Sequence, residues 1–202
     1  MSEQTIDALC EQLKTYCSAD EVANVRAAYL FAERAHAGQQ RMSGEPYITH
    51  PLAVAFILAG LQLDATAIIA ALLHDVVEDT EVTDANLLQN FGAEVAALVD
   101  GVTKLKRIKF DSREEQQAEN LRKMFMAMAK DIRVLIIKLA DRLHNMRTIR
   151  YQTPETQRRK ARETLEIFAP SRTVWGSTPS SGSWKTSPCA ISTRSNTTAL
   201  ST

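Results

Sequence analysis

Apolar residues recur at helical spacing from the start of the chain to about residue 170, and short polar segments separate one apolar group from the next. No stretch shows the sustained alternation of apolar and polar residues that is typical of a half-buried strand. The first clear helix opens with a capping box at Ser18 to Glu21, continues through Val22 and Val25, and ends before Gly38. The pattern therefore predicts an all-α body.

The polar segment 39–47 contains a glycine and a proline and is predicted to be a loop. Pro51 suits the first position of the helix that follows, because a residue at that position needs no N–H donor. His50 is therefore predicted to stand at a helix N-terminus. Four apolar residues are expected to form the buried face of this helix: Val54, Ile57, Leu58 and Leu61.

The next helix is predicted to begin after Asp64, which would cap it, and to continue through residue 79. Thr83 opens a short helix that ends near Gly92. Another helix follows, with apolar positions at Val95, Leu98 and Val102. We expect these two elements to serve in packing.

Two long helices and a final one complete the predicted body. A second capping box at Ser112 to Glu115 begins an amphipathic helix. Residues 132–148 begin almost wholly apolar and then become polar; a strand is an alternative for the first six of them, but the longer helical period favours a helix. Thr153 and Pro154 begin the last helix, which is expected to run through Phe168.

The segment 70–79 places ionisable side chains beside a very apolar stretch. His74 and Glu78 are four residues apart, as are Asp75 and Asp79, so each pair would share one edge of a helix. A buried carboxylate is costly unless it is paired or coordinates a metal, and neighbouring imidazole and carboxylate groups are both ligands for divalent ions. We interpret this segment as half of a metal site.

The composition narrows the possible classes of function. The 202 residues carry no net charge, and only 6% of them are aromatic, so we expect no nucleic-acid partner and favour a small ligand. No apolar run is long enough to suggest a membrane span or a leader sequence, and the three cysteines are scattered, so we expect no membrane partner and a cytoplasmic location.

Three predicted elements together offer four metal ligands. His50 stands at a helix start, His74 and Asp75 lie in the apolar segment, and Asp141 lies where residues 132–148 become polar. Two imidazoles and two carboxylates on packed helices could hold one divalent ion with positions left for water and substrate.

Three motifs in this order resemble the hydrolase domain of the Rel/SpoT bifunctional enzymes, which make and degrade the alarmone guanosine 3′-diphosphate 5′-diphosphate (ppGpp). The resemblance covers about residues 5–170. The motifs are Tyr47-Ile48-Thr49-His50-Pro51, the segment Ala71 to Thr80 with His74-Asp75 and Glu78-Asp79, and the segment Lys138 to Thr148 with Asp141-Arg142-Leu143-His144-Asn145.

The resemblance implies an HD-domain helical bundle that hydrolyses the 3′-pyrophosphate of ppGpp or its 5′-triphosphate relative in the stringent response. It implies that His50, His74, Asp75 and Asp141 bind Mn²⁺. It also implies that Glu78 and Asp79 activate or orient the attacking water, although both could instead be a solvated helix end.

By the same resemblance, the guanine nucleotide is expected to contact four residues: Arg41, Ser43, Asn145 and Thr148. Arg41 could instead be an ordinary loop charge, and Asn145 could simply bond the end of its helix. Many relatives have a lysine where this chain has Met42, so one cationic contact is expected to be missing. His36 and His144 are expected to be hydrogen-bonded neighbours of the ligands or core residues, and not ligands.

Other functions remain open at this point. The chain could be an HD-type phosphohydrolase that acts on another nucleotide, although the Arg41 loop argues against this. It could resemble the small metazoan alarmone hydrolases, with action on NADPH, although residues 112–132 look like the long bacterial enzymes. It could also be a nucleotide-binding regulatory domain without turnover, but such a domain is expected to lose ligands, and all four are present.

The domain prediction divides the chain at residues 152 and 170. Residues 1–152 would form the hydrolase domain, and 153–170 would begin the connector to a synthetase domain. In residues 171–202 half of the positions are Ser or Thr and none is acidic, so this tail is expected to be disordered. In a shifted frame, codons for Ser171 to Gly176 permit Ala-His-Arg-Leu-Gly, which resembles the family, so a single-base loss near Pro170 is expected to have removed the synthetase and regulatory domains.

Overall fold

In the computed structural model, which describes residues 4–106, 130–162 and 164, helix α4 (Ala65–Leu73) lies at the centre of the fold. It packs against four other helices: α2 (Ala19–Ala35), α3 (Thr49–Gly60), α6 (Asp84–Lys106) and α8 (Ile132–Arg147). Its residues are apolar on all sides, and nearly all are buried. A helix of this kind is stable only inside a core, which explains its central place.

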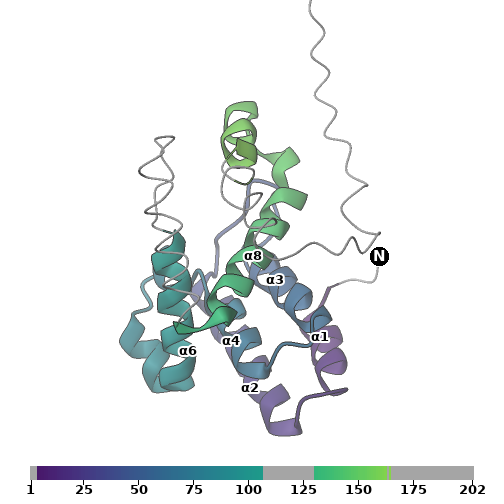
Figure 1. The fold of residues 1–202 in the computed structure, drawn as a ribbon, viewed down its shortest axis with the longest axis vertical. Helices are drawn as coiled ribbons and strands as arrows, with labels where there is room; N and C mark the ends of the chain where they lie inside the picture. Colours follow the sequence, from purple (N-terminus) through teal and green to yellow (C-terminus); the bar gives the residue numbers. More distant parts are fainter. Residues whose placement is uncertain (1–3, 107–129, 163, 165–202) are drawn as a thin grey trace, which may run out of the picture.

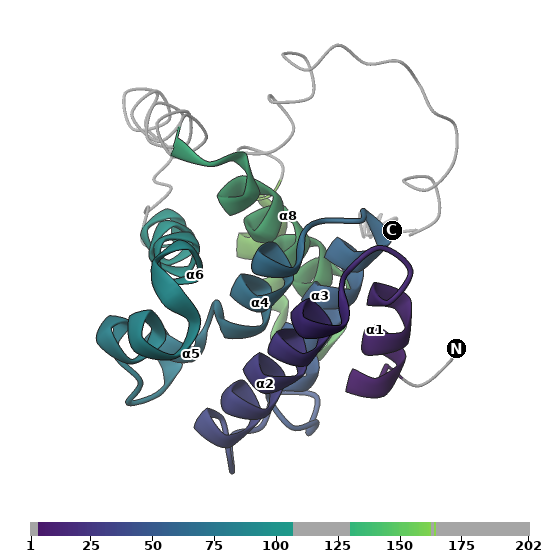
Figure 2. The same ribbon diagram turned by 90° about the horizontal axis from the view of Figure 1, so that it is seen from below.

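The other helices surround α4. Helix α1 (Ile6–Leu13) packs on α2 and α3, and α6 lies on the opposite side of the molecule from α1 (Figures 1 and 2). The short helices α5 (Val76–Asp79) and η1 (Ile149–Tyr151) follow α4 and α8, and residues 154–162 are helical. Apart from one isolated β-bridge, all regular secondary structure in the described residues is helical, so the predicted all-α fold is confirmed.

Several predicted helix boundaries are confirmed. Ser18 and Glu21 form both hydrogen bonds of the capping box at the start of α2. Gly92 has a positive φ of 84° and divides α6 into two helical parts, as the sequence indicated. The strand alternative for residues 132–137 is wrong, because α8 is helical from Ile132 onwards.

The predicted continuous helix from Asp64 to residue 79 is wrong, because it is interrupted at His74 and Asp75. The ring Nδ1 of His74 lies 2.7 Å from the carbonyl oxygen of Ala71, an acceptor that the helix would otherwise use. Asp75 then serves as the N-cap of α5. Asp64 does occupy the N-cap position of α4, but its carboxylate pairs with Arg133 instead of capping the helix.

Two expectations for α3 are also wrong. The helix begins at Thr49, two residues before Pro51, because a turn at Pro46 and Tyr47 already leads into it. Pro51 is still tolerated, since the first four N–H groups of a helix have no partner within it. Leu61 is 62% exposed and not part of the buried face, because α3 ends at Gly60 and the chain then turns away.

Helix α1 was not predicted as a separate element. Its N-cap Thr5 accepts a hydrogen bond from the backbone of Ala8, and Leu9 and Leu13 are fully buried. The helix predicted from Ser112, the positions from Leu165 to Phe168 and the tail 171–202 lie outside the described residues.

Helix α8 is held in place by contacts of its N-terminal half. Arg133 pairs with Asp64 and Glu94 at 2.7 Å each, which links α8 to the start of α4 and to α6. At Gly101 the helices α6 and α8 approach so closely that an added Cβ would lie 2.8 Å from Val134 Cγ2. These contacts fix where the second half of α8, which carries Asp141, meets α3 and α4.

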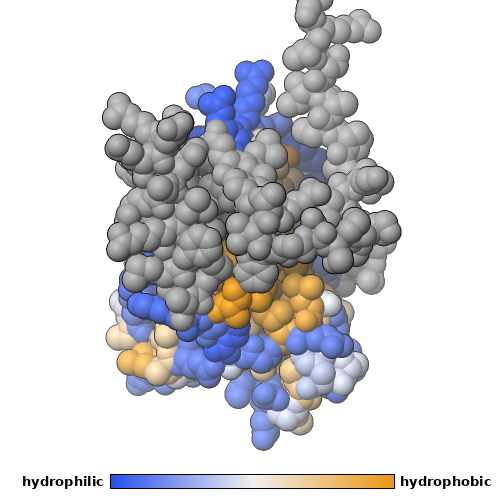
Figure 3. All heavy atoms as spheres, in the orientation of Figure 1, coloured by the Kyte–Doolittle hydropathy of each residue, from blue (hydrophilic) through white to orange (hydrophobic). Residues whose placement is uncertain are grey.

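On the face drawn in Figure 3, hydrophobic atoms gather near the middle of the described part, whereas its outer parts are mostly hydrophilic. No helix within the described ranges is both long and apolar enough to span a lipid bilayer.

Candidate metal centre and active site

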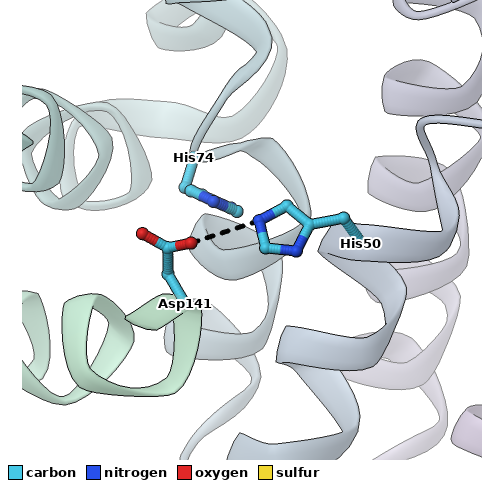
Figure 4. A group of neighbouring side chains, drawn as sticks. All are labelled: His50, His74 and Asp141. Carbon is cyan, nitrogen blue, oxygen red and sulfur yellow. Dashed lines mark ion pairs between the residues drawn. The ribbon is translucent and has the colours of Figure 1, made fainter. Parts of the chain in front are cut away.

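Three buried side chains from three different helices converge at one point. His50 comes from the first turn of α3, His74 from the end of α4 and Asp141 from the middle of α8 (Figure 4). One ligand atom of each lies within 4.8 Å of the others, and His50 Nε2 is 3.2 Å from Asp141 Oδ1. The structure thus brings together residues that are up to 91 positions apart in the sequence.

Asp75 completes this group. Its Oδ2 lies 3.2 Å from His74 Nε2 and 3.7 Å from His50 Nε2. All four predicted ligands are at most 5% exposed, so two imidazoles and two carboxylates face one another inside the core. The break between α4 and α5 allows both His74 and Asp75, which are adjacent in sequence, to point to the same place.

The outer nitrogen of each imidazole is engaged away from the centre. His74 Nδ1 bonds the carbonyl oxygen of Ala71, and His50 Nδ1 lies 2.7 Å from His144 Nδ1. These contacts turn both Nε2 atoms toward the carboxylates. Holding the outer nitrogen of a ligand histidine in this way fixes the orientation of the ring, and a partner that can only accept, such as the Ala71 carbonyl, also fixes its tautomer.

The Asp141 carboxylate is also held from outside. Lys138 Nζ lies 2.6 Å from Oδ2, and the amide of Asn145 donates to Oδ1. Burial alone would raise the pKa of Asp141, but the hydrogen bond from His50 and the charge of Lys138 outweigh burial and hold this pKa well below its usual range. Burial lowers the pKa of His50, so the imidazole remains neutral. An ionised carboxylate and a neutral imidazole are the forms that bind metals.

The group suits a divalent metal ion. His74 Nε2 is buried and makes no hydrogen bond to any part of the chain that the structure describes. Its near neighbour is the Asp75 carboxylate at 3.2 Å, and a metal ion at the centre would satisfy both groups, which are costly to bury without well-formed bonds. A donor set of two nitrogens and two carboxylates is typical of sites for divalent transition-metal ions, including Mn²⁺.

Glu78 and Asp79 lie next to the centre on α5. The hydroxyl of Tyr47 is 2.8 Å from Asp75 Oδ2 and 2.8 Å from Asp79 Oδ2, so it connects a candidate ligand to a candidate catalytic carboxylate. Burial raises the pKa of Tyr47, and the neighbouring Asp75 charge raises it further, so the hydroxyl keeps its proton. Tyr47 lies in a motif quoted above, but the sequence alone gave it no role.

Glu78 and Asp79 also line an open cleft with a volume of about 680 Å³. Its other lining residues include the acidic Glu81, and none of the four candidate ligands lines it. Phosphate groups would be repelled by these carboxylates, so we do not assign the cleft to the phosphates of a nucleotide. It does give solvent access to Glu78 and Asp79.

Of the four residues predicted to contact the nucleotide, two lie beside the metal centre and two bond only to residues close to them in the sequence. Arg41 donates to the Asn145 side-chain oxygen at 3.1 Å, so these two residues meet beside Asp141. Ser43 bonds Glu45 within its own loop, and Thr148 bonds the carbonyl of His144 at the end of α8. The structure therefore brings Arg41 and Asn145 together at the centre, whereas Ser43 and Thr148 are engaged locally.

Two cationic residues near Arg41 were missed by the sequence interpretation. Lys160 is half-buried, and its pKa is lowered first by burial and then by the charges of Arg142 and Arg41. Arg142 directly follows Asp141 and could have been noticed for that reason. Nothing in the sequence around Lys160 indicates a role, because only the folding of the chain brings it near Arg142 and Arg41.

The remaining two histidines are not in the group of four. His144 bonds His50, as described, and His36 is buried, stacks on Tyr47 with ring centroids 4.6 Å apart and bonds Gln39. Both are hydrogen-bonded, as expected, but only His36 is fully buried, whereas His144 is partly buried and contacts a ligand.

Most of the chain is similar to known proteins. Residues 28–173 match the HD domain family. The chain is 56% identical over 164 residues to the bifunctional (p)ppGpp synthase/hydrolase SpoT of Escherichia coli. The matched region makes up 81% of this chain but only 23% of that protein. It is also 62% identical over 146 residues to a GTP pyrophosphokinase of Streptomyces coelicolor. Here the matched region makes up 72% of this chain and 17% of that protein. The chain thus spans about a quarter or less of the length of these relatives.

A solved structure described as a metazoan ortholog of SpoT that hydrolyses ppGpp is similar to this chain, with a TM-score of 0.60 and 30% sequence identity. The match covers 76% of this chain and 86% of that one. The predicted helical HD fold is confirmed by this match and by the family match.

Proposed function

Because the chain belongs to the HD domain family and is homologous to the SpoT and Rel enzymes of ppGpp metabolism, we propose that it hydrolyses the 3′-pyrophosphate of (p)ppGpp. In this reaction water attacks the phosphorus attached to the 3′ oxygen, and the bond between them breaks. The products are pyrophosphate and GDP, or GTP from the 5′-triphosphate. This activity would lower the alarmone level in a stringent response.

The observation that carries the proposal is the buried group of His50, His74, Asp75 and Asp141. We assign these residues to a Mn²⁺ ion, because the mixed nitrogen and oxygen donors suit it. When bound, such an ion lowers the pKa of a water molecule and offsets negative charge on the phosphate oxygens.

Glu78 is the residue we assign to accept the proton of the attacking water, since it lies on α5 directly after the ligand pair and is reached by solvent from the cleft. Asp79 is assigned to orient that water, together with Tyr47, whose hydroxyl contacts Asp79 and Asp75. The 3′ oxygen takes up a proton as the pyrophosphate leaves.

The nucleotide would bind on the Arg41 side of the centre, where the positive charges gather. Arg142 and Arg41 are close enough to Lys160 for their charges to lower its pKa, after the larger effect of burial, and pyrophosphate is an anion that such a group would attract. Asn145, Thr148 and Ser43 are proposed as further polar contacts of the guanine nucleotide. Met42 is 70% exposed and adds no charge to this side.

The domain organisation remains a proposal as well. We assign residues 1–152 to the hydrolase domain and 153–170 to a helix that connects it to further domains in longer relatives. The helical residues 154–162 support the second assignment.

The function is tested by incubating the full chain, freed of metal and then given Mn²⁺, with ppGpp, pppGpp, GTP and NADPH in parallel, followed by separation of the products. We expect pyrophosphate from ppGpp and pppGpp alone. Turnover of a nucleotide without a 3′-pyrophosphate would favour a different HD-type hydrolase, and ppGpp binding without products would favour a regulatory domain.

A further inference from the structure

The contact between His50 and His144 has a specific chemical meaning. The two Nδ1 atoms are 2.7 Å apart, and the ring centroids are 4.9 Å apart with the planes tilted by 37°. At this separation the two nitrogens share a single hydrogen, so one ring donates and the other accepts. The contact therefore links the tautomer of His50 to that of His144.

The tautomer of His50 decides whether it can be a ligand. A neutral imidazole that binds a metal through Nε2 must carry its hydrogen on Nδ1. However, two carboxylates lie beside Nε2, with Asp141 at 3.2 Å and Asp75 at 3.7 Å. These acceptors favour the opposite tautomer, with the hydrogen on Nε2, in which the ring donates to Asp141 and cannot bind a metal.

At His74 the outer contact settles the tautomer. A carboxylate also lies beside its Nε2, with Asp75 Oδ2 at 3.2 Å, but its Nδ1 faces the carbonyl oxygen of Ala71, which can only accept a hydrogen bond. A neutral His74 ring therefore carries its hydrogen on Nδ1 and presents Nε2 as the ligand atom. His50 has no backbone carbonyl at its Nδ1 in the described structure and depends on a side chain instead.

We propose that His144 is a positioning residue that accepts the Nδ1 hydrogen of His50 and thereby keeps His50 in the tautomer that binds the metal. This inference rests on the metal centre proposed above, but not on the identity of the nucleotide. It also explains why α8 carries His144 three residues after Asp141: a single helix supplies one ligand and holds another.

A matched pair of substitutions isolates the acceptor. Asparagine places its side-chain oxygen near the position of histidine Nδ1, whereas leucine has almost the same shape as asparagine and no acceptor. We would compare His144→Asn and His144→Leu with the parent in the full chain, measuring Mn²⁺ affinity by calorimetry. Thermal unfolding in the presence of chelator would report whether the fold itself has changed.

The expected result is that His144→Leu weakens Mn²⁺ binding by about 10- to 100-fold, the range for removing such an outer partner, while His144→Asn recovers most of the affinity. Both variants should unfold at a similar temperature without metal, and ppGpp turnover by the leucine variant should recover as Mn²⁺ is raised to saturation.

Equal Mn²⁺ affinity in the parent and both variants would overturn the inference, and so would equal weakening in the two variants or loss of turnover by the leucine variant that saturating Mn²⁺ does not restore. If the parent itself binds no divalent ion, the proposed metal centre fails, and this outcome is distinct from the others.

Discussion

The metal centre and the loop 39–47 lie side by side but are built in opposite ways. The four candidate ligands are at most 5% exposed and are held by contacts from three helices. In the loop, Met42 is 70% exposed, Gly44 has a φ of 84°, and Ser43 bonds its own loop neighbour Glu45. The centre is therefore formed by the fold itself, whereas residues 42–45 of the loop hydrogen-bond within the loop. Arg41 and Tyr47, on either side of them, reach Asn145 and Asp75.

This difference predicts which step each region controls. Changes in the buried centre should affect metal binding and the chemical step, because the ligands cannot be replaced by other groups in the core. Changes at residues 41–45 of the loop should affect mainly the affinity for the nucleotide, whereas Tyr47, which contacts Asp75 and Asp79, belongs with the centre. The following substitutions test this division.

The largest effect is expected from Asp75→Asn, which removes one negative charge from the centre. We expect Mn²⁺ affinity to fall by more than about 100-fold, beyond the range for outer partners, and ppGpp turnover to be lost with it. Calorimetry and product separation would measure the two quantities. Asp20→Asn, at an exposed carboxylate on α2, is the control, and metal binding by the Asp75 variant at the parent level would remove Asp75 from the ligand set.

Glu78→Gln is expected to separate metal binding from chemistry. The variant should keep its Mn²⁺ while turnover falls by about 10²- to 10⁴-fold, the usual contribution of a group that transfers a proton. Glu81→Gln is a matched control, because Glu81 lines the same cleft but lies outside the motif. A Glu78 variant as fast as the parent would show that this carboxylate does not handle the proton.

Tyr47→Phe removes the hydroxyl between Asp75 and Asp79 without changing the ring. Loss of about one hydrogen bond should lower turnover by about 10-fold, with a smaller effect on metal affinity. Tyr29→Phe, whose hydroxyl bonds Glu33 away from the centre, should leave turnover at the parent value. If both variants behave alike in a steady-state assay, Tyr47 has no positioning role.

The smallest effect on the chemical step is expected from Arg41→Ala. We expect KM for ppGpp to rise by about 10-fold while kcat changes little, the pattern of a contact that binds substrate and transition state equally. Arg34→Ala, at an exposed position on α2, is the control. A fall in kcat with KM unchanged would place Arg41 in the chemistry and would contradict the division between the two regions.

Local signals were sufficient for much of the fold. The capping box at Ser18, the positive φ of Gly92 and the helical period of α8 all depend on residues near one another in the sequence, and the structure agrees with each of them. Roles that depend on tertiary contacts were not predictable: Asp64 pairs with Arg133 of α8 instead of capping α4. The early start of α3 has a local cause, the turn at Pro46 and Tyr47, which the position of Pro51 concealed in the sequence.

The same distinction applies to the site. Metal-ligand residue types in familiar motifs indicated the four ligands, and the structure places their side chains together. The side chains that hold them were harder to assign, because a tyrosine, a lysine or a histidine in a helix gives no sign of what it touches. Tyr47 and His144 acquire their roles only when α3 and the loop before it pack against α5 and α8. Lys138 differs, because it pairs with Asp141 three residues along the same helix.

The central claim is that the buried centre, loaded with a metal ion, cleaves the 3′-pyrophosphate of ppGpp. The most direct measurement is to strip the protein with chelator, titrate Mn²⁺ back, and record bound metal and pyrophosphate release in the same samples. We predict that the rate of GDP and pyrophosphate formation rises in proportion to the bound metal, levels off at a single ion per chain, and falls to zero when chelator is added again. Hydrolysis by the stripped protein, or unchanged ppGpp at full metal occupancy, would contradict it.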